Sequence, residues 1–191
     1  MSAIEIHEPK LSRFLFANTR LSLFWLIIRI CVGYQWVMAG WSKLENPMWL
    51  GKSAGFAIKN FIDHALLQNA GGGQYMPTWY SYFIQHVVLR HPVFFSYLVA
   101  YGEILVGVAL ILGLFTGIAA LFGIFMNANY LFAGSISINP IMIVLELILI
   151  LAWRTAGWVG LDRFILKSFV VTSTDRPAIN KPNKLMFRNT I

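Results

Sequence analysis

Residues Val93–Gly123 read VFFSYLVAYGEILVGVALILGLFTGIAALFG, a run in which almost every residue is apolar. The part from Val93 to Phe115 is long enough to cross a bilayer as a helix, since about 20 residues at about 1.5 Å each span the hydrocarbon core. Thr116 and Gly117 permit a tight reversal, and a second apolar segment follows at once. The run therefore predicts a hairpin of two membrane helices.

One carboxylate, Glu103, interrupts the first half of this run. It lies roughly 15 Å from either end of the expected span, which is mid-membrane depth. An ionisable group at that depth costs on the order of 3 kcal/mol, so we expect it to face the protein interior and to have a partner there. Glu103 is the first candidate functional residue.

The composition favours the same class of protein. Hydrophobic residues make up 58% of the chain and charged residues 12%, about half the charged share of soluble domains. The net charge is +7, but the basic residues concentrate near the two termini beside apolar segments. That distribution indicates membrane topology and contact with anionic lipids, and it argues against nucleic-acid binding. We therefore expect a single all-α domain in a lipid bilayer.

We expect a four-helix membrane bundle with spans at about residues 21–41, 93–115, 117–133 and 141–158, within a domain of residues 21–166. Residues 1–20 and 167–191 are interpreted as a cytoplasmic tail and a basic, flexible tail. Residues 42–92 form a long external loop, whose apolar periodicity predicts one or two amphipathic interfacial helices. Lysine and arginine are frequent before the first span and after the fourth, and absent from the turn between the third and fourth. Both termini are therefore predicted to be cytoplasmic.

The first span carries a polar stripe, because spacings of three and four place its members on one helix face. The members are Arg29, Gly33, Trp36, Gly40 and Lys43. An arginine cannot lose its proton to escape burial, so a carboxylate is the expected partner. Glu103 comes to a similar depth and is predicted to be that partner. Lys43 either pairs with a carboxylate or extends from the helix end towards water.

These polar residues have two interpretations. In the first, two buried ion pairs, Arg29–Glu103 and Lys43–Glu146, only hold the helices in register. In the second, they line a polar pocket that opens to the outer leaflet, where carboxylates handle protons and aromatic rings enclose a flat ligand such as a quinone. Glu103 is then the catalytic proton-handling group and Arg29 its charge partner. The candidate pocket residues are Lys43, Glu146, Asn127, Trp36 and Tyr101, with Trp41 and Tyr130 as further aromatic walls.

Several cofactors lack the residues they need. Haem between helices requires histidines within the spans, and the predicted spans contain none. The lone Cys31 cannot build a disulfide, an iron–sulfur cluster or a haem attachment motif. The loop histidines have no metal-ligand spacing, so no metal site and no covalently bound cofactor are predicted. The chain can offer a quinone site and a proton path, whereas a partner must carry electrons.

Four motifs resemble the DoxX/DoxD family of small membrane proteins. They are the R-x-x-x-G-x-x-W-x-x-x-G-x-x-K stripe, YGEILVGVALILGLFT (residues 101–116), MNANYLFAGSISINP (residues 126–140) and AGWVGLDRF (residues 156–164). The resemblance implies a four-helix bundle in the cytoplasmic (plasma) membrane. It also implies a likeness to the DoxD subunit of thiosulfate:quinone oxidoreductase, which works with a DoxA subunit.

The leading hypothesis is therefore the membrane subunit of a quinone-linked oxidoreductase, which the family resemblance implies to be of the thiosulfate:quinone type. The alternative is a non-catalytic membrane anchor or assembly partner for a redox protein, with the external loop as its docking surface. Under the first hypothesis a DoxA-like or other redox subunit is the expected partner. The sequence leaves open whether the chain forms a homo-oligomer and whether it is itself catalytic.

Overall fold

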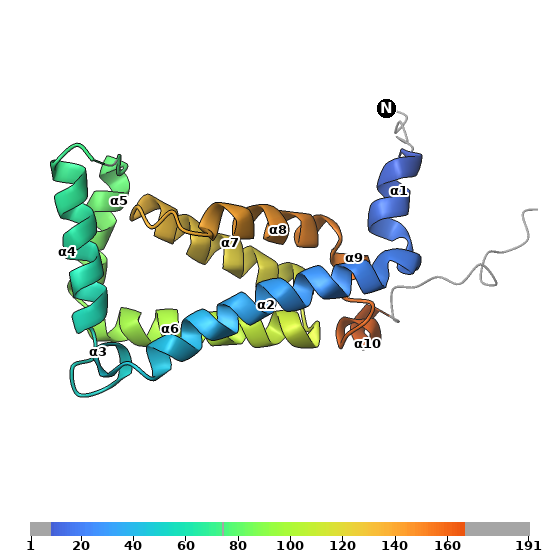
Figure 1. The fold of residues 1–191 in the computed structure, drawn as a ribbon, viewed down its shortest axis with the longest axis horizontal. Coiled ribbons are helices and arrows are strands. Elements are labelled where there is room, and N and C mark those ends of the chain that lie inside the picture. Colours follow the sequence, from blue (N-terminus) through green and yellow to red (C-terminus); the bar gives the residue numbers. More distant parts are fainter. Residues whose placement is uncertain (1–8, 74, 167–191) are drawn as a thin grey trace, which may run out of the picture.

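The computed structural model describes residues 9–73 and 75–166, and within these ranges the chain is helical with no β-strand (Figure 1). The longest apolar helices are α2 (Ser22–Leu44) and α6 (Pro92–Leu112). Among the described residues they provide the two segments that are long and apolar enough to cross a membrane, Thr19–Leu44 with 26 residues and Pro92–Leu112 with 21. The first segment includes the short 3₁₀ turn η1 (Thr19–Leu21).

Helices α7 (Thr116–Phe132) and α8 (Asn139–Leu151) are also apolar but shorter. In Figure 1, α2 lies along α6, and α7 lies along α8. The chain reverses direction between α2 and α6, between α6 and α7, and between α7 and α8. The hydrophobic core of this part contains Trp25, Val32, Trp36, Leu110 and Leu149. We refer to α2, α6, α7 and α8 together as the apolar helices.

Glycines let α2 and α6 approach until their backbones touch. A Cβ atom on Gly33 would lie 2.8 Å from the carbonyl oxygen of Gly107, and one on Gly107 would lie 2.7 Å from that of Gly33. Further along, a Cβ atom on Gly40 would lie 2.8 Å from the Ile104 side chain. Small residues at these contacts are typical of closely packed membrane helices. They fix the register between α2 and α6.

The reversal between α6 and α7 comes earlier than the expected turn at Thr116 and Gly117. Helix α6 ends at Leu112, and Gly113 follows with φ +66°. Glycine adopts this left-handed conformation without a Cβ penalty and is the usual residue after a helix end. Phe115 also has a positive φ, of 48°, and Thr116 already begins α7. The second span is therefore shorter than residues 93–115.

The segment between α2 and α6 forms a helical cap across one end of the apolar helices (Figure 1). It consists of α3 (Pro47–Leu50), α4 (Phe56–Ala70), α5 (Thr78–Phe83) and the π-helix η2 (Ile84–Val88). The cap has its own buried cluster, which includes Ile62, Tyr80 and Ile84. The Tyr80 hydroxyl donates to the Asn129 carbonyl at 2.9 Å and so ties the cap to α7.

The fourth apolar segment is not one continuous helix over residues 141–158. Helix α8 ends at Leu151, α9 (Trp153–Ala156) is short, and α10 (Asp162–Leu166) follows. The Thr155 hydroxyl donates to the Ala152 carbonyl at 3.1 Å at the break between α8 and α9, a local bond that competes with regular helix. The carbonyls of Ala156 and Val159 are thereby available to α2, as described below.

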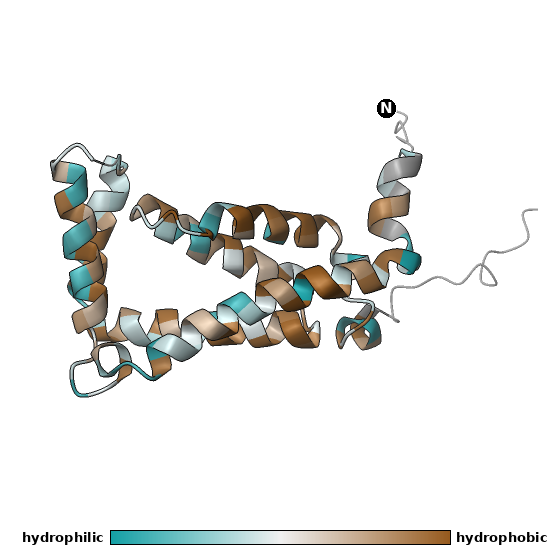
Figure 2. Cartoon of the chain, in the orientation of Figure 1, coloured by the Kyte–Doolittle hydropathy of each residue, from teal (hydrophilic) through white to brown (hydrophobic). Residues whose placement is uncertain are grey.

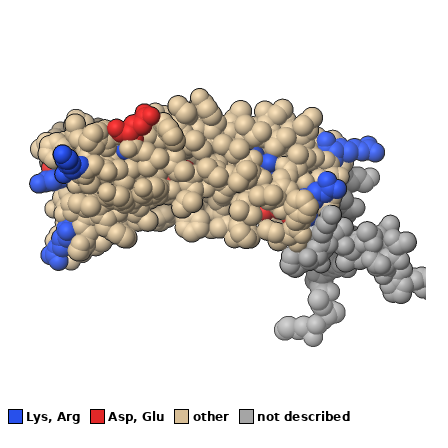
Figure 3. Space-filling model, turned by 90° about the horizontal axis from the view of Figure 1, so that it is seen from below, with Lys and Arg blue, Asp and Glu red and all other residues tan. Residues whose placement is uncertain are grey.

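The surface also suits a bilayer. Hydropathic colouring shows apolar residues on the outer sides of the apolar helices (Figure 2), and exposed side chains there include Leu23, Phe24, Leu105, Phe125 and Leu147. In Figure 3 the basic side chains gather towards the two ends, with a nearly uncharged face between them. Helix α1 (Lys10–Ala17) lies at the end opposite the cap. The expected C-terminal tail, residues 167–191, falls outside the described residues.

Candidate functional site

A cavity of about 550 Å³ lies among the apolar helices, with α3 and α4 of the cap contributing to its wall. This volume is within the usual range for small-molecule sites. The wall mixes aromatic and aliphatic side chains with a few polar groups. Its residues are Gln35, Trp36, Met38, Ala39 and Lys43 of α2, with Trp49, Phe61, Glu103, Asn127, Tyr130, Ser135, Ser137, Ile138, Asn139 and Met142.

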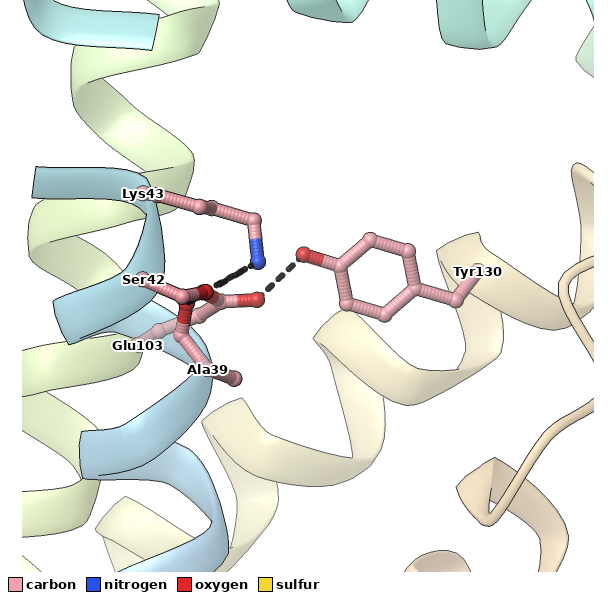
Figure 4. A network of polar contacts seen from close by, with 5 residues as sticks. All are labelled: Ala39, Ser42, Lys43, Glu103 and Tyr130. Carbon is pink, nitrogen blue, oxygen red and sulfur yellow. Dashed lines mark hydrogen bonds and ion pairs between the residues drawn. The ribbon is translucent and has the colours of Figure 1, made fainter. Parts of the chain in front are cut away.

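Lys43, Glu103 and Tyr130 form a hydrogen-bonded triad in this wall (Figure 4). The Lys43 ammonium lies 2.6 Å from Glu103 Oε2, and the Tyr130 hydroxyl donates to Glu103 Oε1. Glu103 is fully buried, whereas the Lys43 side chain keeps 15% of its surface. The carboxylate is therefore satisfied on both oxygens, and its charge is matched inside the cavity wall.

Aromatic rings surround the lysine of the triad. Its ammonium lies 5.2 Å from the centre of the Trp49 ring and 5.8 Å from that of Tyr130. Ring faces at these distances attract a cation, more strongly when water is excluded. A bound ligand would thus meet a fixed positive group backed by two aromatic side chains.

Glu146 belongs to a second buried cluster, directly behind the wall. Trp36 Nε1 donates to Glu146 Oε1 at 2.6 Å, and Asn127 Nδ2 donates to Oε2 at 2.9 Å. Trp36 and Asn127 line the cavity, while Glu146 is fully buried and does not. Gly123 leaves room for this carboxylate, because a Cβ atom there would lie 2.4 Å from Oε1. The predictions that Glu146 lines the pocket and pairs with Lys43 are therefore wrong.

Arg29 does not pair with Glu103, contrary to the sequence-based prediction. Its Nη1 donates to the Ala156 carbonyl at 2.8 Å, and its Nη2 donates to the Val159 carbonyl at 2.7 Å. These carbonyls are free because the chain leaves regular helix after α8. Arg29 is buried, and a planar guanidinium suits two acceptors held side by side. It fastens α2 to the segment after α9, away from the cavity.

Asp162 completes this fastening at the start of α7. Its carboxylate accepts from the Phe115 amide at 2.6 Å and from the Thr116 amide at 2.9 Å, which caps the helix and complements its dipole. The surroundings are tight, because a Cβ atom on Gly113 would lie 2.1 Å from Arg29 Nη1. We call Arg29, Gly113, Phe115, Ala156, Val159 and Asp162 the clasp. Its contacts indicate a structural role, which replaces the predicted catalytic role of Arg29.

The structure thus brings together four of the predicted site residues around the cavity: Trp36, Lys43, Glu103 and Asn127. Tyr101 is not among them. Half of its surface is exposed on the outside of α6, where its ring stacks with Tyr97, so the prediction that it lines the pocket is wrong. Trp41 is also exposed and donates to Glu45.

Sequence reasoning also missed two contacts. Tyr130 was expected only as an aromatic wall, yet it donates to Glu103. The sequence did indicate that Tyr130 faces the same side as Asn127, because the two residues lie three positions apart on one helix. Asp162 was not singled out, although it lies within the AGWVGLDRF motif. No group of three or more metal-binding side chains occurs in residues 9–73 and 75–166.

Comparison with known proteins bears on the identity of the chain. The family model DoxX matches residues 24–135, which is more than half of the sequence and runs from α2 to the end of α7. No curated protein and no solved structure matches the chain. The matched range holds the triad, Trp36 and Asn127, whereas Glu146 and Asp162 lie beyond it. Together with its apolar helices, the match identifies a membrane protein, and the chain belongs to the DoxX family.

Proposed function

We propose that this protein is the membrane subunit of a quinone-linked oxidoreductase, and that its cavity binds the quinone. The observation that carries the proposal is the triad of Lys43, Glu103 and Tyr130 in the wall of a cavity that is otherwise largely apolar and aromatic. The thiosulfate:quinone type is the finer assignment, and it rests on the family resemblance alone. Electrons would come from a partner of the DoxA kind or another redox subunit.

In this proposal the apolar helices form a four-span bundle in the plasma membrane. Helix α7 has 17 residues, about 25 Å at 1.5 Å per residue, which is close to the hydrocarbon thickness. Helix α8 is shorter, and α9 with the clasp extends it to the same end. The basic residues near both termini support a cytoplasmic location for these ends. The cap and the cavity mouth then lie at the outer surface.

The triad provides what a quinone head group needs. A quinone presents two carbonyl oxygens, which accept hydrogen bonds, on a flat ring, which packs against aromatic side chains. Lys43 can donate from its ammonium, Tyr130 can donate when its hydroxyl turns from Glu103 to the ligand, and Trp36, Trp49 and Phe61 are the rings. Reduction to a quinol takes two electrons and two protons. Tyr130 and Glu103 are positioned to deliver protons at the cavity, because they share a hydrogen bond there.

Two tyrosines offer a matched test of this site. Tyr130→Phe and Tyr101→Phe each remove one hydroxyl, but only the first lies in the cavity wall. Binding of a short-tailed quinone to the purified protein is measured by quenching of tryptophan fluorescence, since Trp36 and Trp49 line the cavity. We expect Tyr130→Phe to weaken binding by about tenfold, as loss of one hydrogen bond of about 1.4 kcal/mol would do, and Tyr101→Phe to leave it unchanged. Equal affinities for both variants, or no quenching at all, would reject the quinone site.

A second candidate function is a membrane anchor for a redox protein that docks on the cap. The cap supports the anchor function because it has its own buried cluster and also apolar side chains that face outward. Leu67 is 72% exposed and Tyr75 84%. Leu67→Lys would then abolish co-purification of the partner while quinone binding persists. Partner retention by this variant would argue against docking at that surface.

A further inference from the structure

The two buried glutamates among the described residues have different partners. Glu103 faces a cation, because Lys43 lies 2.6 Å from it. Glu146 is equally buried, but both of its hydrogen-bond partners, Trp36 and Asn127, are neutral. No ion pair of Glu146 occurs among the described residues. Its charge, when it is ionised, is balanced only by the dipoles of two N–H groups.

A buried carboxylate without a countercharge is costly, and taking up a proton removes the charge. A protonated carboxyl group needs an acceptor for its new O–H, as well as donors for its remaining lone pairs. Trp36 can only donate, so it suits Oε1 in both protonation states. An asparagine side chain carries both a donor and an acceptor. Asn127 can therefore donate to Oε2 when Glu146 is ionised and, after rotation of its amide, accept from a proton on Oε2.

We propose that Glu146 is a reversible proton-binding site that exchanges protons with water in the cavity, and that rotation of the Asn127 amide opens the way between them. Glu146 does not line the cavity itself, whereas Asn127 does. Asn127 thus lies between the carboxylate and any water or ligand in the cavity. The proton leaves a hydronium ion in the cavity, so one O–H bond breaks there as the O–H bond at Oε2 forms, and the Asn127 amide keeps its own hydrogens.

The position of this site relates it to the triad. Asn127 and Tyr130 lie three residues apart on α7 and so share one helix face. The Glu146 cluster is therefore about one turn further along α7 from the Tyr130–Glu103 hydrogen bond. Proton binding at Glu146 does not depend on the bound ligand. Its use as a proton source for quinone reduction rests on the proposed function.

The other charged and titratable groups near Glu146 leave it without a countercharge. Lys43 of α2 and Glu103 of α6 are paired with each other in the cavity wall, and Tyr130 of α7 donates to Glu103. Arg29 of α2 is held by the carbonyls of the clasp. Arg154 of α9 is exposed, and its guanidinium lies over the Trp153 ring. Each cation on the neighbouring elements thus has another partner or faces outward.

Infrared difference spectroscopy between acidic and alkaline pH tests this proposal on the purified full-length protein without added quinone. Protonation of a buried carboxyl group produces a carbonyl-stretching band that its ionised form lacks. The other carboxyl groups titrate as well, so the Glu146 band is the component of the wild-type spectrum that we expect Glu146→Gln to remove completely and Glu103→Gln to retain. Glutamine has the size of glutamate, so Glu146→Gln is the least disruptive probe of the site. Circular dichroism establishes that each variant is folded.

Trp36→Phe and Asn127→Leu keep the proposal testable even where Glu146→Gln fails to fold. Each removes one hydrogen bond to the carboxyl group, so each is expected to shift the frequency of the Glu146 band. A wild-type difference spectrum without the band, identical spectra for wild type and Glu146→Gln, or loss of the band in Glu103→Gln alone would overturn the proposal. Because no quinone is present, these outcomes are independent of the quinone-binding test. Failure of quinone binding with an intact band would reject the proposed function alone.

Discussion

Lys43 and Glu103 lie 60 residues apart in the sequence and form an ion pair with 2.6 Å between Nζ and Oε2 in the wall of the cavity. The pair joins the C-terminal end of α2 to the middle of α6. Tyr130 of α7 donates to the same carboxylate, so helices from three parts of the chain meet at one buried acid. Stability and ligand binding are both expected to depend on this junction.

Removing the cation alone should be more harmful than removing both charges. Lys43→Met leaves Glu103 buried without a countercharge, which costs about 3 kcal/mol in comparable pairs. Lys43→Met combined with Glu103→Gln removes the unpaired charge and should restore most of that loss. Thermal unfolding in mild detergent measures the difference. Equal destabilisation of the single and double variants would show that the pair is not coupled.

Arg29 is expected to affect stability and not ligand binding. Arg29→Gln removes two hydrogen bonds to the clasp, each charge-assisted and worth about 1.5 to 3 kcal/mol. The folded fraction of this variant should bind a short-tailed quinone with wild-type affinity. Arg29→Lys should also be destabilising, because an ammonium cannot reproduce the planar pair of donors. A specific loss of quinone affinity in stable Arg29→Gln protein would return Arg29 to the functional site.

Two glycines provide a test of the space behind the cavity wall. Gly123→Ala places a Cβ atom 2.4 Å from Glu146 Oε1, so the carboxylate must move, at a cost of about 1 to 3 kcal/mol. Gly102→Ala on α6 is the control, because its Cβ atom would meet nothing closer than 3.7 Å. Only Gly123→Ala should lower the unfolding temperature and alter the hydrogen bonding of Glu146. If both variants are as stable as wild type, the Glu146 carboxylate has room to move away from residue 123.

The cap should loosen at high pH through Tyr80. Burial raises the pKa of its hydroxyl from an ordinary value near 10 to about 12. The folded state therefore favours the neutral form, and the stabilisation it gives is complete below about pH 10 and lost as the pH rises to about 12. Unfolding temperatures over this interval should fall more steeply for wild type than for Tyr80→Phe. Parallel pH profiles would exclude a contribution from Tyr80.

Sequence patterns predicted much of this architecture. Apolar runs indicated the helices, amphipathic periodicity indicated α4, and burial cost marked Glu103 as a residue with a partner. The break after α8 was not predicted, because residues 141–153 are apolar except for Glu146 and residues 141–158 contain no proline. The break depends on Arg29, which is distant in the sequence and donates to the Ala156 and Val159 carbonyls that follow the break.

The partner of Glu103 could not be predicted from the sequence, because the distance of a residue from the end of its own span does not give its level on the neighbouring helix. Register is instead set where the glycines touch: a Cβ atom on Gly40 would contact Ile104 and Ala100. Lys43 then lies about one turn beyond the level of Glu103, and helical side chains lean towards the N-terminus of their helix. The long lysine side chain covers the remaining distance. Arg29 lies at the other end of α2, beyond reach of the carboxylate.

Photolabelling with an azido-quinone tests the central claim, that the cavity binds a quinone, most directly. The labelled protein is digested, and the modified residues are located by mass spectrometry, with and without an excess of unmodified quinone. We predict competed labelling on cavity residues, chiefly around Trp36, Trp49 and Tyr130. Labelling that excess quinone does not reduce, or that falls on the outer face of α6 around Tyr97 and Tyr101, would contradict the account.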